Sequence, residues 1–163
     1  MTHSELERDL EKKSRELMRK LLQEHLEARG LGQCKKPVRD SEGIERPRVR
    51  LQERKLETIF GTVSVERAGY GQEGSRSLHP LDAELNLPDE RYSLELRRRV
   101  AEEAAKSSFD ETHDSIGKTT GGHVPKRQIE ELARLAARDI DAHHHHRAAL
   151  FNDSGLCLNR AAL

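Results

Sequence analysis

The chain has 163 residues, enough for one ordinary domain or two very small ones and too few for a large enzyme. Charged residues make up 36% and hydrophobic residues 34%, with only 3% aromatic residues, so a single large core is excluded. The 29 basic and 29 acidic residues cancel, and only a local excess of charge can indicate a nucleic-acid partner. No stretch is apolar enough to span a membrane, and Cys34 and Cys157 form no pair typical of a disulfide framework or a zinc ribbon. We therefore expect a cytoplasmic protein without a membrane partner.

Residues 1–30 predict a long amphipathic helix that runs from Ser4 to Arg29 and ends at Gly30. At about 1.5 Å per residue this helix is about 40 Å long. Its apolar side chains recur at spacings of three, four and seven and therefore share one stripe: Leu6, Leu10, Leu17, Met18, Leu21, Leu22 and Leu26. Either the chain's own domain or a partner helix can bury this stripe, so a homo-oligomer formed through residues 4–29 is one expectation.

A polar linker is expected over residues 31–47, and after it the hydrophobic period changes from helical to alternating. Residues 48–68 predict a β-hairpin that turns at Phe60-Gly61, with one apolar face formed by Val49, Leu51, Val63 and Val65. The polar face is expected to add a sequence-independent contact to DNA phosphates through Arg48, Arg50 and Arg54. A proline-rich bridge completes this segment, which spans residues 48–91.

Residues 92–142 predict a unit of three short helices. Ser93 caps the first helix. Ser108 begins the second helix, and Glu111 three residues later completes a capping box. Pro125 opens the third helix, at a position where its missing N–H group costs nothing. The predicted fold class is therefore α+β and mostly α, with a long N-terminal helix, a β-hairpin and a C-terminal three-helix unit.

The second and third of these helices, with Gly121-Gly122 between them, have the size and spacing of a helix–turn–helix unit. Phe109 and Ile116 are the expected core anchors of its first helix. In such units the second helix enters the major groove of DNA with its N-terminal residues toward the base edges. We expect contacts to bases or phosphates from Lys126, Arg127, Gln128 and Arg134, and clamps on the DNA backbone from Lys118, Thr119, Thr120 and His123. A plain three-helix bundle with solvated charges is the alternative.

The residue pattern predicts no catalytic residue, no metal site and no cofactor. Asp110, Glu111, His113 and Asp114 fall on one short helix, where such side chains are typical of a solvated surface. The run His143–His146 is expected to have no native metal role. Residues 143–163 continue no helical period, and we expect a divergent, disordered tail.

The order of these features resembles the N-terminal region of bacterial insertion-sequence transposases of the ISKra-four group. The resemblance covers roughly residues 4–142 and rests on two stretches, LETIFGTVSVERAGYG and HPLDAELNLPDERYSLELRRRVAEEAAKSSFDETHDSIGKTTGGHVPKRQIEELARLAARDIDA. The matching motifs are Phe60-Gly61 with Arg67, Pro80-Leu81-Asp82, Leu85-Asn86-Leu87-Pro88, Ser93, Ser108-Phe109-Asp110, Thr120-Gly121, and Val124-Pro125-Lys126-Arg127-Gln128.

This resemblance implies a mobile-element protein that binds double-stranded DNA at the terminal inverted repeats of its own element. In such transposases an RNase H-like domain with a DDE acidic triad follows and performs the metal-dependent strand cleavage. The sequence stops where that domain is expected, so we expect a truncated, non-catalytic fragment. The alternative function is a helical self-association module with no specific DNA binding.

Overall fold

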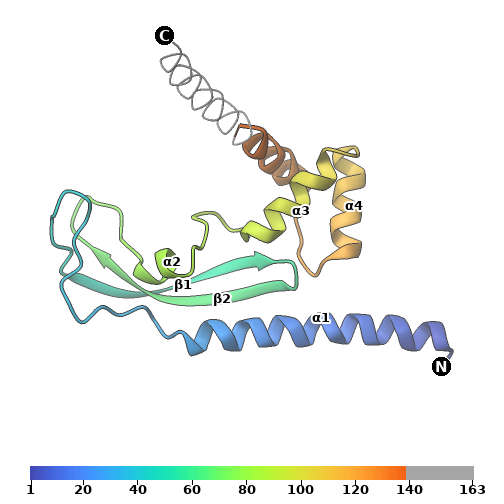
Figure 1. The fold of residues 1–163 in the computed structure, drawn as a ribbon, viewed down its shortest axis with the longest axis horizontal. Coiled ribbons are helices and arrows are strands. Elements are labelled where there is room, and N and C mark those ends of the chain that lie inside the picture. Colours follow the sequence, from blue (N-terminus) through green and yellow to red (C-terminus); the bar gives the residue numbers. More distant parts are fainter. Residues whose placement is uncertain (139–163) are drawn as a thin grey trace, which may run out of the picture.

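The computed structural model describes residues 1–138 and has a mixed α+β fold in which helices predominate, as predicted. The elements in chain order are α1 (His3–Ala28), β1 (Arg48–Thr58), β2 (Gly61–Gly71), α2 (Pro80–Glu84), α3 (Leu94–Ala104) and α4 (Phe109–Thr119). A further helix begins at residue 126 and reaches residue 138, the last described residue; it is called helix 126–138 below. The long α1 runs alongside the two-stranded sheet, and the last three helices gather at the end of the hairpin where it turns (Figure 1).

The first helix begins and ends close to its predicted bounds. Thr2 caps it, and Glu5 completes a capping box by accepting a hydrogen bond from the Thr2 N–H group. Gly30 follows the helix with a φ of 72°, a conformation that favours glycine. Only the last turn of the predicted stripe packs fully into the protein, through the buried Leu26. The prediction of one shared stripe is wrong: Leu22 and Leu26 pack on the hairpin, whereas Leu6, Leu10, Leu17 and Leu21 lie on the opposite side of the helix and stay exposed.

The sheet is an antiparallel hairpin in which Arg48 pairs with Gly71 and Thr58 pairs with Gly61. The turn residues are accordingly Ile59 and Phe60, one position earlier than predicted. Gly61 follows the turn with a φ of 123°, which a side chain would oppose.

The prediction of a single apolar face on the hairpin is wrong. Directly opposed residues of an antiparallel pair share a face, and Val49 lies opposite Tyr70 whereas Val63 lies opposite Leu56. A two-residue turn pairs odd-numbered with even-numbered residues, so the odd-numbered apolar residues of the two strands face opposite sides. Val63 and Val65 are buried, whereas Val49 and Leu51 are exposed, Leu51 to 64%, although Tyr70 and Ala68 opposite them on the second strand are buried.

The face of the hairpin that carries Val63 and Val65 forms one of two hydrophobic clusters. We call it the hairpin cluster, and it consists of Leu26, Leu56, Val63, Val65 and Leu81. Residues 31–47 also contribute to this part of the fold, because the Ala68 N–H group donates to the Leu31 carbonyl and the Cys34 N–H group donates to the Tyr70 hydroxyl (2.7 Å). The predicted linker is therefore held against the hairpin along its first residues.

The second cluster lies inside the three-helix unit. We call it the helical cluster, and it consists of Tyr92, Leu96, Val100, Ile116, Val124, Ile129 and Leu132. The predicted caps are confirmed, because Ser93 accepts a hydrogen bond from the Leu96 N–H group and Ser108 forms its capping box with Glu111. Phe109 is not the expected core anchor: it is 37% exposed, because its place in the first turn of α4 lies outside the cluster. Residues 139–142 and the predicted tail, 143–163, lie outside the described residues.

The three-helix unit contacts the turn of the hairpin, where Gly121 and Gly122 pack against it. The Gly121 N–H group donates to the Ile59 carbonyl at 2.7 Å. A Cβ atom at Gly122 would lie 2.7 Å from the Thr58 carbonyl oxygen, and one at Gly121 would overlap the Phe60 carbonyl. The double glycine therefore does more than separate the two predicted helices: it allows two backbones to touch.

Candidate nucleic-acid interface

The expected helix–turn–helix consists of α4 and helix 126–138, whose side chains Ile116, Ile129 and Leu132 meet in the helical cluster. The connection between the two helices covers residues 120–125 and is longer than the turn of roughly 3–4 residues in the DNA-binding motif. The extra length is used to reach the hairpin turn. The unit is therefore a variant of the expected motif, with its second helix packed on its first.

Four of the expected DNA-contacting residues are exposed around this connection. Lys118 and Thr119 lie at the C-terminal end of α4, and His123 lies in the connection with its ring edge-on to His113, 5.7 Å away. Arg127 lies in the first turn of helix 126–138 and makes no ion pair with any of residues 1–138. Arg127 is thus an exposed cation, free of ion pairs to the described residues, at the N-terminal end of a helix.

Three further expected contacts are engaged by acidic side chains. Lys126 forms an ion pair with Asp110 at 2.6 Å, which joins the start of helix 126–138 to the start of α4. The remaining two polar contacts are made within helix 126–138, Gln128 to Glu131 at 3.2 Å and Arg134 to Glu130 at 2.6 Å. Exposed pairs of this kind are worth about 0–1 kcal/mol. The carboxylates reduce the positive potential here without burying the cations.

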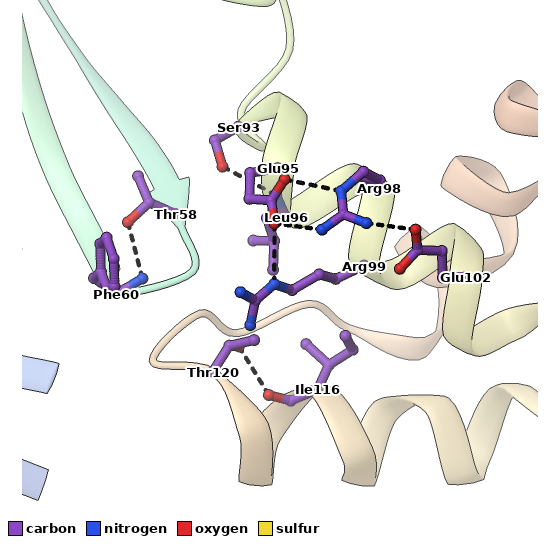
Figure 2. Close-up of polar contacts among 10 residues, drawn as sticks. All are labelled: Thr58, Phe60, Ser93, Glu95, Leu96, Arg98, Arg99, Glu102, Ile116 and Thr120. Atoms are coloured by element: carbon purple, nitrogen blue, oxygen red, sulfur yellow. Dashed lines mark hydrogen bonds and ion pairs between the residues drawn. The ribbon is translucent and has the colours of Figure 1, made fainter. Parts of the chain in front are cut away.

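Thr120 differs from the expectation, because it is buried. Its hydroxyl donates to the Ile116 carbonyl at 2.8 Å (Figure 2). The same hydroxyl accepts a hydrogen bond from the Gly122 N–H group at 3.2 Å. These bonds satisfy the end of α4 and shape the glycine connection. Thr120 therefore acts inside the fold and is removed from the set of DNA-contacting residues.

Arg54 is also placed differently from the expectation. It is 13% exposed and donates to the carbonyl oxygens of Pro88 and Glu90, at 2.8 and 2.5 Å, which ties β1 to the proline-rich bridge. Arg67 lies beside it in contact with Asp82, and burial lowers the pKa of the Arg67 guanidinium. The geometry gives Arg54 a structural role, because its donors are already directed at backbone oxygens.

The other two hairpin arginines line a cleft of about 250 Å³ at the open end of the hairpin. Arg48 pairs with Glu73 at 3.3 Å, whereas Arg50 makes no ion pair within the described residues. Gly69 and Gly71 also line this cleft. Arg48 and Arg50 therefore stay accessible, as expected, at the opposite end of the hairpin from the three-helix unit.

A larger groove of about 690 Å³, which sequence reasoning did not identify, separates α1 from the hairpin turn. Its basic residues follow one face of α1 at spacings of four, three and four: Arg8, Lys12, Arg15 and Arg19. The same spacing is present in the sequence, but the sequence analysis assigned a function only to the leucines of this helix. The other wall of the groove includes Phe60 and Gly121, so it borders the connection after α4.

Arg15 joins this groove to the three-helix unit. Its guanidinium donates to the carbonyl oxygens of Lys118 (2.8 Å) and Thr120 (3.3 Å), and so satisfies the C-terminal end of α4 where the helix dipole is negative. Glu11 pairs with Arg15, and Glu16 pairs with Arg19 at 2.7 Å.

Arg8 and Lys12 make no ion pair within residues 1–138, so the groove carries an excess of positive charge. This excess lies on the wall that α1 provides.

The predicted surface role of the acidic residues on α4 agrees with their contacts. Asp110 pairs with Lys126, Glu111 belongs to the capping box, and the His113 Nδ1 atom lies 2.9 Å from the Val124 carbonyl oxygen. Among residues 1–138 no group of three or more His, Cys, Asp or Glu side chains is placed to hold a metal ion. Within the same residues, no helix combines the length and the apolar character needed to cross a membrane.

Comparison with known proteins found no matching family model, no matching curated protein and no matching solved structure. The resemblance to transposases of the ISKra-four group accordingly rests on the sequence motifs alone.

Proposed function

We propose that the chain is a cytoplasmic double-stranded DNA-binding protein that acts as the N-terminal part of an insertion-sequence transposase and recognises the terminal inverted repeats of its element. The observation that carries the proposal is Arg127, which is exposed in the first turn of helix 126–138 and makes no ion pair within residues 1–138; this helix packs against α4. The N-terminus of a helix attracts phosphate through its free N–H groups and its dipole. In the resembled transposases strand cleavage belongs to a separate RNase H-like domain, and our proposal for this chain is recognition without catalysis.

The proposed contact surface has two parts. Arg127, Lys118 and His123 surround the connection after α4 and supply donors to base edges or phosphates. Arg8 and Lys12 lie along the neighbouring groove and supply contacts to the phosphate backbone. Lys126 joins this surface when a phosphate replaces Asp110, an exchange between two exposed anions that costs little.

Fluorescence anisotropy with duplexes of the element ends and with scrambled duplexes, across a series of salt concentrations, tests this proposal. We expect Arg127→Ala to weaken binding to the element ends by about 1–3 kcal/mol. Arg8→Ala should weaken binding to both duplexes and reduce the salt slope by about 0.9. The matched control is Arg98→Ala, which removes the same charge from α3, where Glu95 and Glu102 hold the guanidinium (Figure 2). Equal binding to both duplexes together with a flat salt slope would contradict the proposal.

The exposed leucines of α1 favour a second function, association with another copy of the chain. Leu10 and Leu17 are more than half exposed, although they belong to the predicted stripe. Removal of α1 is unsuitable as a test, because Leu26 belongs to the hairpin cluster. The double variant Leu10→Ser/Leu17→Ser leaves that cluster intact, and sedimentation of the full chain should show a loss of dimer relative to the wild type.

A further inference from the structure

The outer face of α1 carries a narrow row of leucines that the fold leaves exposed. They are exposed to between 39% and 56% and consist of Leu6, Leu10, Leu17 and Leu21. At 3.6 residues per turn they fall within an arc of about 60°. Arg15, Leu22 and Leu26, which face the remainder of the fold, lie on the opposite side of the helix. The row is therefore separate from the face of α1 that packs on the hairpin.

The spacing of this row is the same in both directions along the helix. Successive leucines are four, seven and four residues apart, so a second copy in the opposite orientation meets Leu21 with Leu6 and Leu17 with Leu10. Within one helix the pair Leu6 and Leu10 is repeated eleven residues later by Leu17 and Leu21. Eleven residues are close to three full turns of a straight α-helix, so all four leucines stay on one face. A two-fold symmetric contact requires a surface that is complementary to itself in this way.

The charges beside the row have the same self-complementarity. One flank carries alternating signs along the helix: Asp9, Lys13, Glu16 and Lys20. In an antiparallel pair the same flank of each helix faces its counterpart. Lys20 then lies opposite Asp9 of the second copy, and Lys13 lies opposite Glu16 of the second copy. All four side chains are at least 43% exposed, and their present partners are on the same helix: Lys13 pairs with Asp9 at 2.7 Å, and Glu16 pairs with Arg19 at 2.7 Å and with Lys20 at 3.9 Å.

A parallel pair lacks this match. Opposite flanks face each other in a parallel pair, which places Lys13 beside Met18 and Lys20 beside His25 of the second copy. Neither contact offers a carboxylate to the lysine. The charge pattern of α1 therefore distinguishes the two orientations.

We propose that two copies of the chain associate through the outer leucine face of α1 in an antiparallel orientation, with the two-fold axis near Ser14. This assignment rests on the proposed self-association and specifies its surface, its register and its symmetry. The occupant is a second copy because both the leucine spacing and the flanking charges complement themselves. In the resulting dimer the two basic grooves lie on faces of α1 turned away from the contact.

Disulfide trapping tests the orientation in the full chain, with the native cysteines replaced by serine (Cys34→Ser/Cys157→Ser). We expect Ser14→Cys to form a disulfide-linked dimer, because it lies at the two-fold axis. Leu6→Cys alone should remain unlinked, whereas an equimolar mixture of Leu6→Cys and Leu21→Cys should form mixed dimers. Efficient linkage of Leu6→Cys with itself, and none in the mixture, would overturn the antiparallel register.

Sedimentation of the parent chain without added cysteines tests self-association separately from the antiparallel register. A monomeric parent refutes self-association and the register together, while a dimeric parent with the parallel pattern of linkage refutes the register alone. DNA binding by the same samples reports on the DNA-binding proposal independently of either outcome.

Charge exchange gives a second measurement. Lys13→Glu/Lys20→Glu and Asp9→Lys/Glu16→Lys each carry one sign along the flank, and each should dimerise about tenfold or more weakly than the wild type at low salt. A mixture of the two should recover dimer formation as the heterodimer. Circular dichroism controls for loss of α1 itself, because both variants also remove pairs within the helix. No recovery in the mixture, with α1 intact, would overturn the register.

Discussion

The hairpin cluster and the helical cluster are built in different ways from the same kinds of side chain. The helical cluster takes its members from residues 92–132, a short stretch of three consecutive helices. The hairpin cluster joins Leu26 of α1 to Leu56 and Val63 of the hairpin and to Leu81 of α2, so it needs contacts between distant parts of the chain. Local contacts form at a low entropic cost, whereas distant ones require long loops to close. We therefore expect the three-helix unit to depend less on distant parts of the chain than the hairpin unit, which needs α1.

The largest expected effect comes from removing one fully buried leucine from each cluster. Leu96→Ala and Leu81→Ala should each lower the free energy of unfolding by about 2–5 kcal/mol, because each leaves a cavity. Hydrogen exchange should then separate the clusters, with Leu81→Ala lowering protection in the hairpin and α1 while the three-helix unit stays protected. Leu94→Ala, at an exposed position of α3, is the control. If each variant lost protection equally in the hairpin unit and in the three-helix unit, the two clusters would unfold as one unit.

An intermediate effect is expected where the three-helix unit contacts the hairpin turn. Gly122→Ala places a methyl group 2.7 Å from the Thr58 carbonyl oxygen and 3.0 Å from the Leu96 side chain, and should destabilise the chain by about 1–3 kcal/mol. Gly117→Ala lies in α4 with open space around it and should instead stabilise the chain by about 0.5–1 kcal/mol. Urea unfolding of the two variants measures the difference. If Gly122→Ala were as stable as Gly117→Ala, the close approach of the two backbones would be refuted.

The smallest expected effect concerns the exposed face of α3 and its dependence on pH. Hydrogen bonds from Arg98 and Arg99 lower the pKa of Glu95 from 4.5 to about 2 (Figure 2). Because the pKa is lower in the folded state, the stabilisation by this carboxylate is present above pH 4.5 and is lost as the pH falls through about 2. The difference in melting temperature between the wild type and Glu95→Gln should therefore shrink between pH 5 and pH 2. The control is Asp114→Asn, because Asp114 makes no ion pair within the described residues. If the difference in melting temperature between the wild type and Glu95→Gln stayed constant with pH, the lowered pKa of Glu95 would be contradicted.

The surface around Arg127 was partly predictable from the sequence. Its basic character and its place in the first turn of a helix followed from Pro125 and the residues after it. The ion pair between Lys126 and Asp110 was not predictable, because the two residues lie on different helices whose relative packing brings them together. The basic groove on α1 was likewise hidden, since its existence depends on where the hairpin turn sits against that helix.

By itself the sequence determined the kinds of element and several of their boundaries. Capping at Ser93, the capping box at Ser108 and Glu111, and the alternation along each strand involve neighbours within a few residues, so local physics is sufficient for them. The tertiary structure alone decided which face of α1 is covered, which residues of the hairpin are buried, and that Thr120 and Arg54 act inside the fold. Burial is a property of two surfaces in contact. A pattern read along one segment shows that it has an apolar side or a donor to satisfy, but the partner is supplied by residues far away in the chain.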